Sequence, residues 1–252
     1  RVVPSDAEQG QAMAAVATAD GMDNIAVVHM TNDYGAGLAD AFVSNMDASH
    51  ICTQLGYDVE TTTDFASAVE AVSNAGCTSV FLVSYAADGA MILEEMATQG
   101  VNIPVYGGDG IAEEGLAAGM ADASIVNGVI ASKPSAGGSM SEVQMVFASL
   151  CGAHPDCAGG IYTAEAFDAI TMMALSAFTY LSTPGLDAGM AVNAVGQGWD
   201  GASGTLSFMA NGDVPSSGFC IGEFSHDSAD DSVSYDCVRQ WDIINGITTN
   251  SA

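Results

Sequence analysis

The sequence predicts an α/β fold built on a parallel sheet, and the stretch 78–110, TSVFLVSYAADGAMILEEMATQGVNIPVYGGDG, is the main basis for this prediction. It opens with the apolar run 80–83, whose β-branched and aromatic residues are typical of a strand buried on both faces. Apolar residues at three- and four-residue spacing over 90–97 indicate a helix that ends at Gly100, and a short strand over 103–106 follows. Strand, helix and strand form a βαβ unit with both strands parallel.

The chain before this unit also alternates helix and strand. Ser5 and Glu8 fit a capping box at the start of a helix, and IAVVHM is a second run typical of a buried strand. The expected elements are, in order, a helix over 6–20, a strand over 25–30, a helix reaching about Leu55, a strand over 57–63 and a helix over 65–75.

After the βαβ unit the pattern of apolar and polar residues changes twice. The expected elements are a strand over 127–131, a break in the pattern over 133–138, helices over 141–150 and 163–180, and short antiparallel strands from Gly204 onward. We place a crossing between two lobes at the break. Met172 and Met173 are expected to fill the core, since a soft-metal site needs several converging sulfur ligands.

Three polar side chains follow three of the predicted parallel strands. Tyr34 comes after the strand 25–30, Tyr85 after 80–83, and Asp109 sits in the glycine turn after 103–106. Open α/β sheets bind ligands at the carboxyl ends of their strands, so we expect these three residues to line one crevice. An exposed carboxylate beside an aromatic hydroxyl suits an ammonium group. The alternative is that Asp109 only caps the helix that follows it.

The charge of the chain limits its partners. Its 252 residues include 31 acidic side chains against three basic ones, Arg1, Lys133 and Arg239, which gives a net charge of −28. Nucleic acid and anionic membrane surfaces would repel such a chain. Because 49% of the residues are hydrophobic and only 13% charged, we expect a folded protein with an acidic surface, suited to a saline or halophilic setting.

The sequence contains six cysteines, an even number that allows all of them to pair. Cys151 lies near Cys157 and Cys220 near Cys237, which leaves Cys52 and Cys77 as the third pair. Neither spacing nor the four histidines suggest zinc, so disulfides and an oxidising compartment outside the cytoplasm are the favoured interpretation. Six reduced thiols in a cytoplasmic protein are the alternative.

Motifs for catalysis and cofactors are missing from the sequence. It contains no GxSxG, HExxH, P-loop or dinucleotide GxGxxG motif, and we expect neither a cofactor nor an enzyme. Asp109 and Glu165 have no nucleophile or metal beside them. The loop HDSADDS, which begins at His226, is compatible with a divalent cation, but a solvated acidic loop is the favoured interpretation because the spacing is not that of an EF-hand.

The order of several motifs resembles that of a known family. NDYGAGLA, YGGDG and YTAEAFDA, with RVVPSDAEQG before them and GTLSFMANGD after, are similar to the branched-chain amino acid (Leu/Ile/Val) binding proteins of ABC transporters. The resemblance implies the type I periplasmic-binding fold, in which two Rossmann-like lobes with parallel sheets close over an amino acid. It also implies that Tyr34 and Tyr85 line the cleft and that Asp109 accepts hydrogen bonds from the ligand's ammonium group.

The resemblance gives an expected division of the chain. Residues 1–132 would be the ligand-binding lobe 2, 133–204 the remaining helical part of lobe 1, and 205–252 the strands that cross between lobes. Arg1 matches the point where the family's chain enters lobe 2, about a hundred residues from its start, so we expect lobe 1 to be incomplete in this sequence.

The resemblance implies a function and leaves two alternatives open. The leading prediction is an extracytoplasmic, secreted or periplasmic solute-binding protein that delivers an amino acid to a membrane ABC permease. No apolar run has membrane-spanning length. One alternative is a ligand-sensing receptor ectodomain. The other is a structural surface or filament protein that reuses the binding fold and self-assembles.

Overall fold

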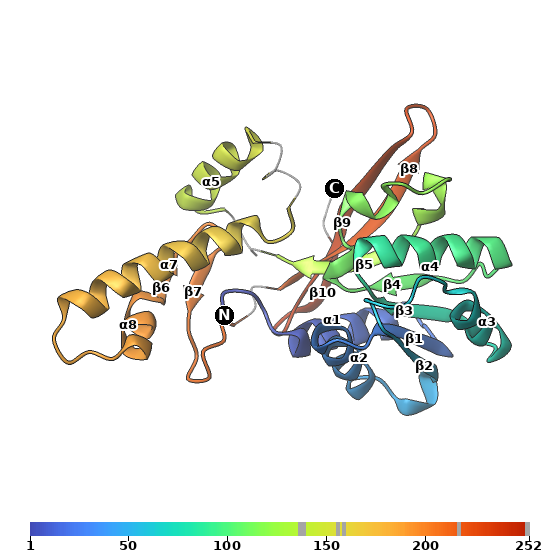
Figure 1. Cartoon of the computed structure of the whole chain (residues 1–252), viewed down its shortest axis with the longest axis horizontal. Helices are drawn as coiled ribbons and strands as arrows, with labels where there is room; N and C mark the ends of the chain where they lie inside the picture. The colour runs from blue at the N-terminus through green and yellow to red at the C-terminus, as the bar shows by residue number, and fades with distance from the viewer. Residues whose placement is uncertain (136–139, 155–156, 158–159, 216–217, 250–252) are drawn as a thin grey trace. The chain divides into compact units, whose positions relative to one another are not determined.

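A computed structural model of the chain describes residues 1–135, 140–154, 157, 160–215 and 218–249 (Figure 1). The chain divides into two compact units. Unit 1 comprises Arg1–Ser5 and Pro134–Gly218, and unit 2 comprises Asp6–Lys133 and Phe219–Ala252. The chain therefore passes from unit 2 to unit 1 between Lys133 and Pro134, next to the expected crossing, and returns to unit 2 after Gly218. The assignment of the units to lobes stays a prediction.

Unit 2 contains an eight-stranded sheet in the order β10-β9-β8-β5-β4-β3-β1-β2. Strands β2, β1, β3, β4 and β5 pair in parallel, while β8, β9 and β10 pair antiparallel. This confirms the predicted α/β class. The helices and strands of unit 2 are α1 (Asp6–Ala19), β1 (Ile25–Met30), α2 (Asp33–Ser44), β2 (Ile51–Tyr57), α3 (Ala66–Asn74), β3 (Ser79–Val83), α4 (Ala86–Gln99), β4 (Val105–Gly107), β5 (Ile130–Pro134), β8 (Phe219–Asp227), β9 (Ser232–Asp242) and β10 (Gly246–Thr249).

Two hydrophobic cores cover the two faces of this sheet. Along β3 the side chains alternate, so that Val80 and Leu82 join the core formed with α3 and α4, while Phe81 and Val83 join the core formed with α1 and α2. Phe81 stacks on Phe42 of α2 with ring centroids 3.9 Å apart. Burial on both faces explains why β1 and β3 are continuous apolar runs that the sequence identifies correctly.

Strand β2 corrects the prediction of a helix reaching about Leu55 and a strand over 57–63. Helix α2 ends at Ser44, and Asp47 caps a short 3-10 helix, Ala48–His50, by accepting from the Ser49 backbone N–H at 2.9 Å. The following residues form β2, which lies at the edge of the sheet and pairs with β1. Because β2 is an edge strand with mostly half-buried residues, its apolar pattern is weak and does not distinguish strand from helix.

The strands around the expected crossing are also shifted from their predicted positions. Strand β4 begins at Val105, and β5 covers Ile130–Pro134 instead of 127–131. Lys133 and Pro134 therefore belong to a strand and not to the predicted break, whose later residues 136–139 lie outside the described part of the chain. Two short 3-10 helices, Asp109–Ile111 and Glu114–Ala117, take the place of the helix expected after Asp109, and their N-cap residues are Gly108 and Glu113 and not Asp109.

Unit 1 contains helices and a small antiparallel sheet of β6 and β7. Its described elements are α5 (Glu142–Gly152), α7 (Thr163–Ser182), α8 (Ala188–Val195), β6 (Gln197–Asp200) and β7 (Thr205–Ser207). The helices expected over 141–150 and 163–180 are confirmed, and Ser141 forms a capping box with Gln144. Met172 is buried, but Met173 is 71% exposed and does not fill the core as predicted.

Buried Asp168 fixes the loop between β6 and β7 to helix α7. Its carboxylate accepts hydrogen bonds from the Ala202 and Ser203 backbone N–H groups, both at 2.8 Å, and from the Ser203 hydroxyl at 2.6 Å. A carboxylate with no exposed surface and three donors is fully accommodated, so we assign Asp168 a structural role.

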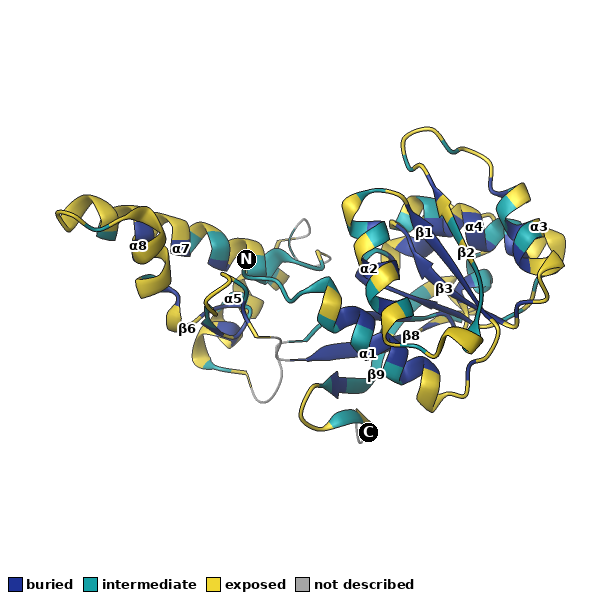
Figure 2. Ribbon diagram, turned by 90° about the horizontal axis from the view of Figure 1, so that it is seen from below, coloured by how far each residue is buried: buried dark blue, intermediate teal, exposed yellow. Residues whose placement is uncertain are grey.

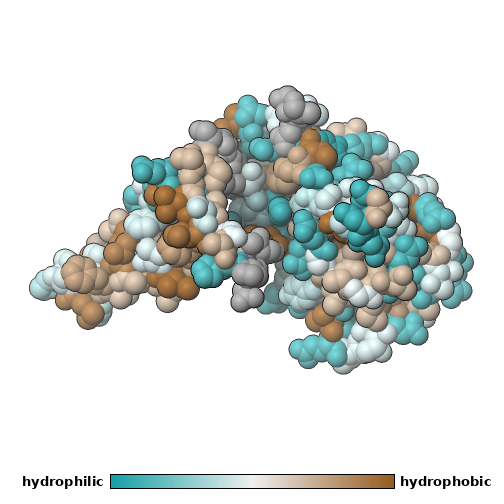
Figure 3. All heavy atoms as spheres, turned by 90° about the horizontal axis from the view of Figure 1, so that it is seen from above, coloured by the Kyte–Doolittle hydropathy of each residue, from teal (hydrophilic) through white to brown (hydrophobic). Residues whose placement is uncertain are grey.

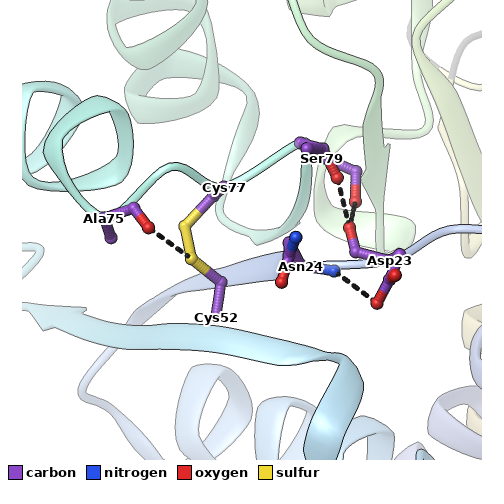
Figure 4. Close-up of a disulfide and its surroundings, with 7 residues drawn as sticks. Asp23, Asn24, Cys52, Ala75, Cys77 and Ser79 are labelled. Carbon is purple, nitrogen blue, oxygen red and sulfur yellow. Dashed lines mark hydrogen bonds between the residues drawn. A yellow bond between two sulfur atoms is a disulfide. The ribbon is translucent and has the colours of Figure 1, made fainter.

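Three disulfides join the cysteines in the pairs expected from the sequence. The Cα–Cα distances are 5.7 Å for Cys52–Cys77, 5.2 Å for Cys151–Cys157 and 5.6 Å for Cys220–Cys237. Cys52 lies in strand β2 and not late in a helix, so its bridge ties the edge strand to the turn before β3 (Figure 4). Residues 155–156, inside the loop closed by Cys151–Cys157, are outside the described part of the chain. No helix within the described ranges is long and apolar enough to cross a membrane.

Candidate functional site

Tyr34, Tyr85 and Asp109 meet at the carboxyl edge of the parallel sheet in unit 2. Tyr34 lies in the first turn of α2, which Asn32 caps by accepting from the Gly35 N–H at 2.8 Å. Tyr85 is the residue before α4, and Asp109 follows β4 by two residues. Because β1, β3 and β4 are parallel neighbours in the sheet, their carboxyl ends bring the three side chains together.

The Tyr34 hydroxyl links the end of β1 to the glycine turn after β4. It donates a hydrogen bond to Asp109 Oδ1 at 2.9 Å and accepts one from the Gly110 N–H at 3.0 Å. A Cβ atom on Gly108 would collide with the Leu38 side chain and one on Gly110 with the Ser84 carbonyl oxygen, and either would lie 3.0 Å from the Tyr34 hydroxyl. The glycines around Asp109 therefore allow the turn to pack closely against these groups. These hydrogen bonds thus hold the glycine turn against the first turn of α2.

The carboxylate of Asp109 is more enclosed than predicted. Asp109 is only 7% exposed, whereas the sequence suggested an exposed acceptor; the Tyr34 hydroxyl bonded to it accounts for part of this burial. Tyr85 is 47% exposed and stacks on Tyr34 with ring centroids 5.8 Å apart and planes 7° from parallel. Tyr85 is therefore the most exposed of the three side chains and Asp109 the most enclosed.

Three further polar residues at the same edge were not predicted. Tyr57 ends β2, Ser84 follows β3, and their hydroxyls are hydrogen-bonded at 2.7 Å. Burial raises the pKa of Tyr57 above its usual value. Asp88, in the first turn of α4, also has its pKa raised by burial, against the lowering effect of the nearby Tyr57 hydroxyl. Its Oδ2 atom is buried without a hydrogen-bond partner among the described residues.

This edge of the sheet combines negative charge with aromatic surface. Asp88 and Asp109 supply negative charge, and Tyr34 and Tyr85 supply aromatic faces that attract cations. Within the described ranges, no group of three or more His, Cys, Asp or Glu side chains is arranged to hold a metal ion. In the acidic loop 226–231, His226 Nε2 instead lies 2.8 Å from Asp231 Oδ1.

Comparison with known proteins gives one family and one fold. A family model described as the receptor family ligand binding region matches residues 1–227. Among curated proteins, the Leu/Ile/Val-binding protein homolog 3 of Brucella melitensis is 32% identical over 114 residues, which cover 44% of this chain and 31% of the relative. The chain thus spans less than a third of that relative's length.

Two solved structures illustrate the shared fold. A leucine-binding protein of Thermotoga maritima is 19% identical with a TM-score of 0.76, over 94% of this chain and 66% of its own. A branched-chain amino acid transporter substrate-binding protein of Streptococcus pneumoniae, solved with isoleucine, is 17% identical with a TM-score of 0.70, over 88% of this chain and 62% of its own. Both support the type I periplasmic-binding fold implied by the motifs.

Proposed function

The chain belongs to the receptor family of ligand-binding regions, and from this premise we propose that it captures a branched-chain or related amino acid outside the cytoplasm for an ABC transporter. The ligand would pass to a membrane permease. The similar proteins named above are binding proteins for leucine, isoleucine or valine, which supports binding and not catalysis as the activity. The three disulfides support an oxidising location.

The Tyr34–Asp109 hydrogen bond beside Tyr85 is the observation on which this proposal rests. A buried carboxylate held in place by a tyrosine hydroxyl is preorganised to accept hydrogen bonds from an ammonium group. The stacked rings of Tyr34 and Tyr85 would cover the aliphatic part of the ligand and add a cation–π attraction. An α-amino acid with an apolar side chain combines these two features.

The test is calorimetric titration of the chain with leucine, isoleucine and valine. Asp109→Asn removes the negative charge but keeps the shape, so we expect affinity to fall about 10- to 100-fold, the equivalent of about 1.5–3 kcal/mol for a hydrogen bond to a charged group. Asp40→Asn, on an exposed residue of α2, is the matched control and should bind like the wild type. Equal affinity of the Asp109 variant and the control would remove Asp109 from the site.

Self-association is a second candidate property. It is favoured by a separate observation, the exposed apolar side chains of α5, α7 and α8 in unit 1.

A further inference from the structure

Strand β2 is an open edge of the sheet in unit 2. It stands last in the strand order and pairs with β1 in parallel. Folded proteins usually protect such an edge with charged side chains, proline or a bulge. The sequence of β2, ICTQLGY, contains neither a charged residue nor a proline, and its bulge lies at its amino end, at Cys52. The rest of the strand, 53–57, is therefore a regular edge without these protections.

One hydrogen bond shows which backbone groups of β2 face outward. The Thr31 N–H donates to the Tyr57 carbonyl at 2.8 Å, so the backbone of Tyr57 faces β1. Because successive residues of a strand alternate in direction, the backbone N–H and C=O groups of Gln54 and Gly56 point away from β1. Both residues are exposed, and none of the residues that the structure describes is hydrogen-bonded to these groups. Two donors and two acceptors thus lie in a row along the edge.

These four groups can pair with the same four groups of a second copy. In an antiparallel ladder, the two residues of a hydrogen-bonded pair exchange both N–H···O bonds. When Gln54 of each copy lies opposite Gly56 of the other, all four groups of both strands are paired about a two-fold axis. Leu55 then faces Leu55 of the second copy. Leu55 is only half-buried against the core formed with α3 and α4, so this contact would cover its remaining surface.

The charges beside β2 favour this antiparallel arrangement. His50 precedes the strand, whereas Asp58 and Glu60 follow it. Antiparallel pairing brings His50 of one copy to the end of the ladder where Asp58 and Glu60 of the other copy lie, and an imidazole N–H can donate to a carboxylate. It also keeps the acidic ends of the two strands apart, while a parallel pairing would bring them together. The strand therefore carries its own complementary charges.

We propose that β2 is an interface between copies of this chain, formed by antiparallel pairing with β2 of a second copy. The net charge of −28 on each copy opposes this contact, and salt screens the repulsion. The dimer is therefore expected in molar salt at high protein concentration and not in dilute buffer. The interface includes none of Tyr34, Tyr85 and Asp109, so this inference does not rest on the proposed function.

The first experiment measures the exchange of individual backbone amides. The N–H groups of Thr53, Leu55 and Tyr57 face β1 and should exchange slowly at every protein concentration, whereas those of Gln54 and Gly56 face solvent in a monomer. Hydrogen exchange is followed by NMR in about 2 M potassium chloride at low and high protein concentration. We expect exchange at Gln54 and Gly56 to slow at least tenfold at high concentration, with no change at the three inner amides.

The second experiment measures dimer formation by sedimentation with two variants of Gln54. Gln54→Pro removes an outward N–H and keeps the pairing with β1, because an edge strand tolerates proline where the N–H faces solvent. Gln54→Ala, the matched control, removes the side chain and keeps the N–H. We expect the dissociation constant of the dimer to rise at least tenfold for Gln54→Pro and to change less than twofold for Gln54→Ala. Circular dichroism establishes that each variant folds, and if Gln54→Pro does not fold, the exchange measurement on the wild type decides.

Three outcomes would overturn the proposal. The first is a chain that stays monomeric in molar salt at its highest soluble concentration. The second is a dimer in which Gln54 and Gly56 exchange as fast as in the monomer, which would assign the contact to another surface, such as the helices of unit 1. The third is slow exchange at these two amides in the monomer, which would show that the edge is already covered. Failure of leucine, isoleucine and valine to bind would remove the proposed function and leave this inference unchanged.

Discussion

The helices of unit 2 bury their apolar faces, whereas those of unit 1 leave theirs open. In unit 2, α1 and α2 cover one face of the eight-stranded sheet and α3 and α4 cover the other, with a separate core on each side. In unit 1 the described residues form one small buried cluster, Met172, Leu206 and Val214. The difference lies in what each set of helices has to pack against.

The exposed apolar surface of unit 1 is extensive. Helix α7 has 20 residues, of which only Asp168, Met172 and Ser176 are buried (Figure 2). On the face shown in Figure 3, hydrophobic residues gather over the part of the chain that contains α5, α7 and α8. A groove of about 600 Å³ between α5 and α7 is lined mainly by apolar side chains such as Val143, Phe147 and Phe167. By contrast, the large exposed apolar residues of unit 2 are Tyr85, Met91, Ile243 and Ile244.

This comparison shows what a sheet contributes to such a fold. A helix with an apolar stripe is stable in water when another layer covers that stripe, and the two-stranded sheet of unit 1 is too small to do so. An apolar surface of this extent is typical of one that further protein covers. Helix α7 therefore has as many apolar residues as a buried helix, although most of them are exposed in this structure.

The largest expected effect is the contrast between two phenylalanines. Phe81 is fully buried and stacked on Phe42, so Phe81→Ala should destabilise unit 2 by about 3–5 kcal/mol. Phe178 on α7 is 72% exposed, and Phe178→Ala should change the stability of unit 1 by less than about 0.5 kcal/mol.

The two tryptophans make this measurement specific to each unit. Trp199 lies in β6 of unit 1 and Trp241 in β9 of unit 2, so Trp199→Phe leaves a reporter for unit 2 and Trp241→Phe one for unit 1. Denaturant unfolding followed by fluorescence in these two backgrounds gives both free energies. A cost above about 2 kcal/mol for Phe178→Ala would show that the surface of α7 is covered in solution.

The next effect in size concerns the disulfides. Cys52–Cys77 closes a separation of 25 residues and Cys151–Cys157 one of only 6. On the chain-entropy account, removing the Cys52–Cys77 disulfide lowers the free energy of unfolding by about 3.5 kcal/mol, and removing the Cys151–Cys157 disulfide lowers it by about 2 kcal/mol. The paired serine variants, compared in the same two tryptophan backgrounds, test this. Equal losses in both units would contradict the entropic account.

How far the sequence predicts this structure also depends on burial. Strands β1 and β3 are covered on both faces and were located correctly, as was α4, which ends at Gly100 with a positive φ of 70°. The edge strand β2 was missed because its more buried positions include a polar residue, Thr53, so that the sequence ICTQLGY does not alternate between apolar and polar residues.

The sequence predicts a residue of the candidate site only where that residue comes soon after a strand that the sequence also predicts. Tyr34, Tyr85 and Asp109 lie shortly after the ends of strands that the sequence predicts. Tyr57 was missed because the sequence places it at the start of a strand, whereas it ends β2, and its hydrogen bond to Ser84 joins residues from different parts of the chain. Such contacts depend on the register between β2, β1 and β3, and local sequence patterns do not specify that register.

The smallest expected effect is electrostatic and has opposite signs in the two units. In unit 2, partial burial of Asp20 acts to raise its pKa, but hydrogen bonds from Arg239 and Tyr106 outweigh it and hold the pKa below its usual value. A lowered pKa in the folded state stabilises unit 2 above the unfolded pKa, and this stabilisation is lost as the pH falls through the folded value. Asp20→Asn should therefore cost about 0.5–1 kcal/mol at neutral pH, because the pair is partly exposed.

In unit 1, burial raises the pKa of half-buried Glu165, against the effect of its backbone hydrogen bond, and the neighbouring Asp168 adds to the increase. Protonated Glu165 is favoured by folding, so its contribution to stability is fully present below the unfolded pKa and is lost as the pH rises through the folded value. Glu165→Gln should thus stabilise unit 1 by about 0.5 kcal/mol at neutral pH and have no effect in acid. Unfolding of both variants from acid to neutral pH, each in the background that reports its own unit, should give differences from wild type that diverge in opposite directions. Parallel curves would show that the two carboxylates experience the same environment, and the electrostatic part of the comparison would then be wrong.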